Sequence, residues 1–163
     1  MTHFAIGRGS RFLVAGLLLG TTALLSPGAS AGECPADQVK QGVRQSGETE
    51  PKGVSDTVLS HIDLATQAVK LEDTQFRMRR LVVEPGGVVP WHSHGERPAL
   101  IYIVSGAITE YSSNCAVPIE HKAGDAAKES VGLAHWWKNN SNEPVVLISS
   151  DILHVKKDDA KVM

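Results

Sequence analysis

Short segments in which apolar and polar residues alternate recur along the chain after about residue 54. The clearest runs from Gln75 to Val83, where Phe76 and Met78 alternate with Arg77 and Arg79. A period of two places successive side chains on opposite faces and is typical of a half-buried β-strand. Similar segments, bounded by Gly, Pro, Asn or Ser, cover 89–94, 98–104, 107–111, 117–122, 134–138 and 145–155. The pattern predicts roughly eight to ten short strands in one all-β domain, a sandwich or barrel.

The two ends of the chain have other patterns. Arg8 and Arg11 are followed by an apolar stretch over 12–25 and by the small residues Ala29-Ser30-Ala31. This order predicts a cleaved signal peptide over residues 1–31. The protein is then periplasmic or secreted, with no stable membrane anchor after cleavage. Residues 32–53 are predicted to form a polar N-terminal arm, 54–155 the barrel and 156–163 a charged tail.

The charge balance weighs against one class of partner. The whole chain has 16 basic and 18 acidic residues, and removal of Arg8 and Arg11 leaves 14 against 18, a net charge of −4. Such a balance gives no electrostatic reason to expect nucleic acid binding. The densest basic cluster is Arg77, Arg79 and Arg80, which we interpret as a solvated strand face.

Cys34 and Cys115 are the only cysteines in the sequence. Export would place them in an oxidising compartment, where a disulfide between them would tie the arm to the barrel. The alternative is a buried thiol at Cys115 and a free Cys34 in a frayed arm.

Two blocks that contain histidine carry the candidate chemistry. The blocks are Gly86-x5-His92-x-His94, closed by Gly106, and Gly124-x7-Gly132-x2-His135-x3-Asn139. Residues i and i+2 of a strand share a face, so the imidazoles of His92 and His94 can reach one metal ion. His135 can supply a third ligand from a separate strand.

Together the blocks resemble the paired motifs of the cupin family, G-x5-H-x-H-x3,4-E-x6-G and G-x5-P-x-G-x2-H-x3-N. The resemblance covers about residues 54–155, and seventeen residues (107–123) separate the two blocks. It implies a jelly-roll barrel of short antiparallel strands in which His92, His94 and His135 bind a metal.

The chain departs from the family pattern at two positions. Ser130 replaces the Pro of the second motif, which changes a turn but not the chemistry. Ala99 stands where the family has its Glu ligand, and a methyl group cannot bind a metal. Glu96, three residues earlier, is a candidate replacement.

Several further residues are candidates for the site. Alternation places Trp137 on the same side as His135, where it could wall a substrate pocket, although packing is its default role. Arg97 could meet an anionic substrate or lie in solvent. Ala99 and Tyr102 complete the predicted pocket. Surface or strand-face positions are expected for His61, His121 and His154. Glu96, Glu110 and Glu129 are general-base candidates by residue type only, so no catalytic residue is identified.

Imidazole ligands suit Fe, Zn, Cu and Ni. Cupins with three histidine ligands include iron dioxygenases, so the resemblance implies an Fe(II)-type dioxygenase-like enzyme for a small anionic or enolisable substrate. Zn, Mn, Ni or Cu are alternatives to iron, and isomerase or lyase chemistry also occurs on this fold. A different class is a cupin that binds a metal or small ligand without catalysis, as a sensor or accessory protein. A third is a structural cupin that has lost its metal. A small-molecule ligand and a homodimer are the expected partners.

Overall fold

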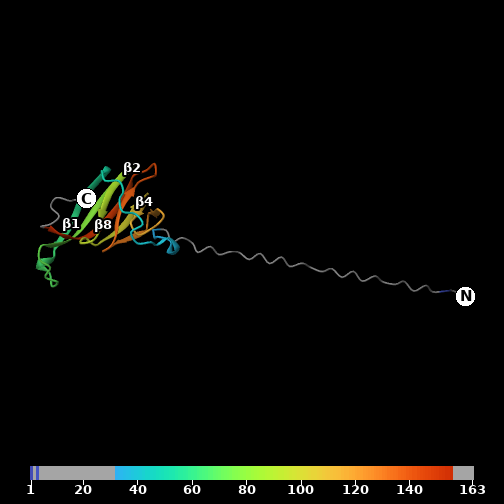
Figure 1. The fold of residues 1–163 in the computed structure, drawn as a ribbon, viewed down its shortest axis with the longest axis horizontal. Helices are drawn as coiled ribbons and strands as arrows, with labels where there is room; N and C mark the ends of the chain where they lie inside the picture. The colour runs from blue at the N-terminus through green and yellow to red at the C-terminus, as the bar shows by residue number, and fades with distance from the viewer. Residues whose placement is uncertain (2, 4–31, 156–163) are drawn as a thin grey trace.

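The computed structural model describes residues 32–155 together with Met1 and His3 (Figure 1). The predicted signal peptide and charged tail therefore lie almost wholly outside the described residues. Within them, eight β-strands make up nearly all the regular structure, and no helix is long and apolar enough to cross a membrane. The elements are η1 (Ala36–Gln38), β1 (Lys52–Asp63), η2 (Leu64–Thr66), β2 (Thr74–Ser93), β3 (Ala99–Ser105), β4 (Ala107–Ser112), β5 (Ile119–Lys122), β6 (Ala126–Glu129), β7 (Ala134–Lys138) and β8 (Val145–His154).

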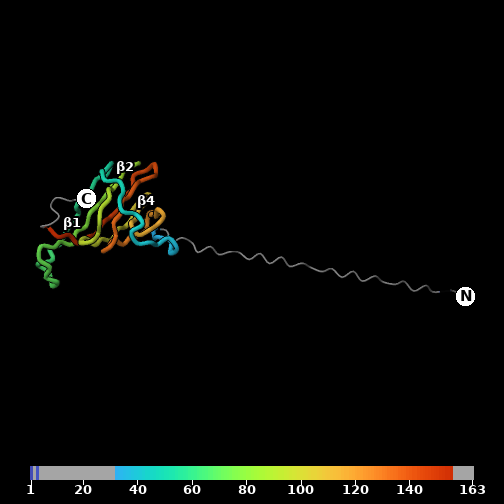
Figure 2. Tube along the Cα trace, in the orientation of Figure 1, coloured from blue at the N-terminus to red at the C-terminus, as the bar shows by residue number. Residues whose placement is uncertain are grey.

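The strands form one antiparallel sheet that curls into a nearly closed barrel, which confirms the predicted fold class (Figure 2). The order is β5-β4-β7-β2-β8-β3-β6, with β1 added to β2. The segments predicted over 75–83 and 89–94 are one long strand, β2. This strand pairs with β8 before Gly86-Gly87, with β7 after it, and with β1 mainly before it. The alternation pattern did not predict β1 or β6 as strands.

An apolar cluster from five strands fills one part of the barrel. Its buried members are Leu81, Val83, Val89, Ile101, Ile103, Ile108, Trp137, Val145 and Leu147. Burial of such side chains contributes about 1.5–3 kcal/mol each and drives closure of the sheet. Polar side chains occupy the rest of the interior, and the candidate functional residues are among them.

Two arginines of β2 that were predicted to face solvent are buried in the polar interior. Arg77 and Arg79 are 5% and 6% exposed, whereas Phe76 is 41% exposed. Arg77 donates two hydrogen bonds, of 3.0 and 2.8 Å, to the carboxylate of Asp151, its register partner on β8. The interpretation of Arg77 and Arg79 as a solvated face is therefore wrong, because Asp151 pairs with both guanidinium groups and Asp56 pairs with Arg79. Arg80 is exposed, as expected.

The N-terminal arm is fastened to the barrel at several points. The predicted Cys34–Cys115 disulfide is present, and the described residues include no free cysteine. Arg44 Nη1 donates a 2.8 Å hydrogen bond to the carbonyl oxygen of Ser112. Gly47 lies so close to the indole of Trp136 that a β-carbon there would approach Cδ1 to 2.1 Å. Covalent, polar and packing contacts thus hold the arm in place.

Candidate metal centre

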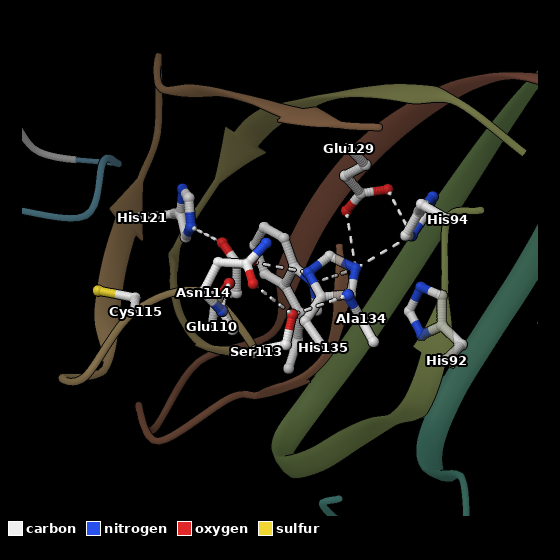
Figure 3. Close-up of polar contacts among 12 residues, drawn as sticks. His92, His94, Glu110, Ser113, Asn114, Cys115, His121, Glu129, Ala134 and His135 are labelled. Atoms are coloured by element: carbon white, nitrogen blue, oxygen red, sulfur yellow. Dashed lines mark hydrogen bonds and ion pairs between the residues drawn. The ribbon is translucent and has the colours of Figure 1, made fainter. Parts of the chain in front are cut away.

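Three histidines converge inside the barrel because two strands pair in register. His92 on β2 lies directly opposite His135 on β7, and His94 follows His92 on the same face. The ring centroids of the three imidazoles are 4.7–4.9 Å apart. One ligand atom from each, together with a carboxylate oxygen of Glu129, lie within 4.8 Å of one another (Figure 3). These groups could hold a metal ion.

The carboxylate of this group comes from a position that the motif pattern did not predict. Glu129 Oε2 lies 3.1 Å from His94 Nε2, and Oε1 lies 3.3 Å from His135 Nε2. Glu129 ends β6, where its register partner on β3 is Ala99. The side chain therefore reaches the site from the strand next to the family's usual Glu position. Glu96, the predicted replacement, is not part of the group.

Backbone carbonyl groups orient two of the imidazoles. His92 Nδ1 lies 2.8 Å from Pro90 O, and His94 Nδ1 lies 2.8 Å from Arg97 O. A carbonyl oxygen can only accept, so each Nδ1 carries the donated proton. The Nε2 lone pair of each ring is then available to a metal.

The third imidazole is oriented by a buried carboxylate. His135 Nδ1 lies 2.7 Å from Glu110 Oε1, and His121 Nε2 lies 2.9 Å from Glu110 Oε2. Burial alone would raise the pKa of Glu110, but the hydrogen bonds from His121 and His135 outweigh it and lower the pKa to about 2. Of the two positions expected for His121, the surface one is wrong, because the residue lies on strand β5 with only 1% of it exposed. Its inward alternation on β5 was the available signal.

The other pKa shifts follow from burial and from the crowding of like groups. Burial, aided by the charge of His135, lowers the pKa of His92 to about 3 and that of His94 to about 4. Burial raises the pKa of Glu129 to about 7. For His135, burial lowers the pKa, but the hydrogen bond to Glu110 outweighs this and raises the pKa above its ordinary value. Glu129 and His135 are therefore the groups whose protons a metal must displace.

Of the four residues predicted to line the substrate pocket, Trp137 and Ala99 lie closest to the metal-binding group. Trp137 is 3% exposed, and its Nε1–H points at the His135 ring, 3.2 Å from Nδ1. Because Nδ1 donates to Glu110, this contact is an N–H···π interaction with the ring face. Ala99 is buried opposite Glu129. Arg97 is buried with Nη1 4.0 Å from Asp151, whereas Tyr102 is 50% exposed on the outer face of β3.

A small cavity of about 30 Å³ adjoins His92 and Glu129. It is lined by Val89, His92, Ile101, Glu129, Trp137 and Leu147. One water needs about 10–15 Å³ by this measure, so the cavity admits about two waters or a ligand of similar size.

Below pH 7 the affinity for a divalent metal is expected to increase by up to about 100-fold per pH unit, about tenfold for each of the two protons that the metal displaces. The reason is that protons on Glu129 and His135 compete with the metal ion for the same ligand atoms. His92 and His94 are already neutral in this range because their pKa values are about 3 and 4. Calorimetric titration with Co(II) between about pH 5.5 and 8.5 measures the slope. The slope should be shallower in Glu129→Gln, and an equal slope in that variant would contradict the role given to Glu129.

Comparisons with known proteins agree with this fold. The family model described as Cupin domain matches residues 79–151. Germin-like protein 5-1 of Oryza sativa subsp. japonica is 33% identical over 76 residues, which are 44% of this chain and 33% of that protein. The chain thus spans about a third of the length of this curated relative.

Two solved structures share the barrel. A predicted oxalate decarboxylase of Thermotoga maritima aligns with a TM-score of 0.53 and 21% identity, over 74% of this chain and 98% of that one. The cupin domain of Schizosaccharomyces pombe Cnp3 aligns with a TM-score of 0.50 and 15% identity, over 68% of each chain. At these identities the likeness shows the fold alone. Residues 79–151 thus match the Cupin domain model, and the barrel that they help to form has the fold of the cupin structures to which it is similar.

Proposed function

We propose that the protein is an exported metal-dependent cupin enzyme whose three histidines and Glu129 hold one divalent transition-metal ion. The convergence of these four buried or half-buried groups carries the proposal. Three neutral imidazoles and one carboxylate suit Fe, Mn, Zn, Ni or Cu, and of these we propose iron. The disulfide supports export, because such bonds persist in oxidising compartments.

The buried charges favour an anionic ligand. Arg77, Arg79 and Arg97 contribute three positive charges, and four buried carboxylates oppose them. The carboxylates are those of Asp56, Glu110, Glu129 and Asp151. With neutral histidines this leaves one negative charge, which a divalent ion converts to one positive charge. A small anionic or enolisable substrate would neutralise it. Arg97 Nη1, which is buried without a hydrogen-bond partner, is the candidate donor to such an anion.

The reaction that we propose is an Fe(II)-type oxygenation. A bound redox-active ion would supply electron transfer and Lewis-acid activation. The surrounding residues serve that chemistry in two ways. Val89, Ile101 and Leu147 line the small cavity with apolar groups that exclude bulk water. Trp137 packs against the His135 ring and fixes it in place.

A second candidate is a cupin that binds a metal or small ligand without catalysis. The observation in its favour is the size of the cavity, because about 30 Å³ leaves little room for an organic substrate beside the ligands. In that case the protein would be a sensor or accessory protein.

Metal analysis and oxygen uptake separate the two functions. Elemental analysis of protein made without chelator should find about one metal per chain, reduced sharply in His135→Ala and unchanged in His61→Ala, a histidine on exposed β1. Fe(II)-loaded protein should then consume oxygen with at least one member of a panel of small thiols, diketones and catechols. Tight metal retention without oxygen uptake would favour the binding protein. Absence of metal would refute both.

A further inference from the structure

The third histidine ligand is held differently from the other two. His92 and His94 donate their Nδ1 protons to neutral backbone carbonyls, whereas His135 donates to a carboxylate. A charged acceptor makes a stronger hydrogen bond than a neutral one. It also makes the imidazole a better electron donor to a metal at Nε2.

The carboxylate of Glu110 is itself fixed from the opposite side. Figure 3 shows Glu110 between His121 and His135, with His121 on the side away from Glu129. His121 Nε2 donates to Glu110 Oε2, while Oε1 accepts from His135, so each oxygen has its own donor. Both residues are buried, at 5% and 1% exposure for Glu110 and His121.

The hydrogen bond to Glu110 is the main polar contact of the His121 ring. Its Nδ1 is buried without a hydrogen-bond partner among the described residues. Its face stacks on Trp137, with ring centroids 4.5 Å apart and planes 28° apart. Trp137 in turn points its Nε1–H at His135. The four side chains therefore form one packed unit from β4, β5 and β7.

We propose that Glu110 and His121 are positioning residues that orient His135 and strengthen it as a metal ligand. This inference rests on the proposed metal site. His121 donates a hydrogen bond to the carboxylate of Glu110, and this carboxylate accepts the Nδ1–H of His135. The Nε2 atom of His135 therefore points toward Glu129 and His94. An ion at this site would have one strong imidazole donor and two ordinary ones.

Cobalt loading tests the inference without any need for a substrate. Glu110→Gln should bind Co(II) about 10–100-fold more weakly than the wild type, because the charge is lost. Its visible Co(II) absorption bands should also shift, because the donor strength of His135 changes. His121→Leu should weaken binding less. His121→Gln should restore it, because the amide N–H can still donate to Glu110.

Glu120→Gln is the matched control, since Glu120 lies on the same strand as His121 but is exposed, accepts a hydrogen bond from Thr109 and is not part of the metal-binding group. It should leave affinity and spectrum unchanged. Wild-type affinity and bands in Glu110→Gln would overturn the inference while the metal site stands. An equal loss of Co(II) affinity in His121→Gln and His121→Leu would overturn the positioning role proposed for His121. A wild-type protein that takes up no Co(II) would refute the proposed function and this inference with it.

Discussion

Replacement of Glu129 by alanine is expected to lower the affinity for a divalent metal by at least about 100-fold. Loss of a residue that only supports a ligand typically costs 10–100-fold, and Glu129 is placed to be a ligand itself. Its oxygens lie 3.1 and 3.3 Å from the Nε2 atoms of His94 and His135. Competition with a chromophoric chelator measures the affinity. Alanine at exposed Glu120 should have no effect, and wild-type affinity in Glu129→Ala would remove this carboxylate from the site.

The pairing of β3 with β6 adds a rescue to this experiment. Ala99 and Glu129 are register partners, and both side chains are buried on the inner face. Glu129→Ala vacates the space that a glutamate at position 99 needs. The double variant with Ala99→Glu should therefore regain at least about tenfold of the lost affinity. Failure of the rescue would mean that a glutamate at position 99 cannot supply the metal ligand that Glu129 supplies.

Loss of the disulfide is the second large expected effect. The bond closes a loop of 81 residues, and in the chain-entropy model such a loop contributes about 4.5 kcal/mol to the free energy of unfolding. Small domains have only about 5–15 kcal/mol in total. Cys34→Ser should therefore lower the melting temperature by roughly 15 °C, given the size of the described domain. Urea or thermal unfolding followed by circular dichroism measures the change.

Reductant supplies the matched control for this variant. Wild-type protein unfolded with reductant should behave like Cys34→Ser, and reductant should not change the variant further. Equal stability of wild type and variant without reductant would show that the other arm contacts, such as Arg44 to Ser112, suffice on their own.

The features that could be predicted from the sequence are those set by local spacing. Alternation indicated most of the strands, because a period of two reflects one buried face. The i, i+2 spacing of His92 and His94 placed both rings on one face, and the second block located His135. The disulfide could be expected because two cysteines in an oxidising compartment tend to pair. Each of these signals lies within a short stretch of chain or within a simple count.

The features that were missed depend on which strands are neighbours. Glu129 enters the metal group only because β6 lies beside β3, and no local pattern showed β6 as a strand. Arg77 is buried only because Asp151 arrives on β8. His121 is buried against Glu110, a partner 11 residues away across a hairpin. Burial of a charged group is decided by its partner, and alternation alone does not identify partners.

The burial of the ligands also has a consequence for how fast a metal can exchange. His94, Glu129 and His135 are at most 4% exposed, and His92 is half-buried. The cavity beside His92 and Glu129, of about 30 Å³, is too small for a typical chelator, so fast release of the ion is expected to need a local opening of the barrel. Exchange is then governed by the rate of that opening and not by the strength of the chelator. Exchange of one bound metal for another in the folded protein should therefore be slower than uptake of a metal by the empty site.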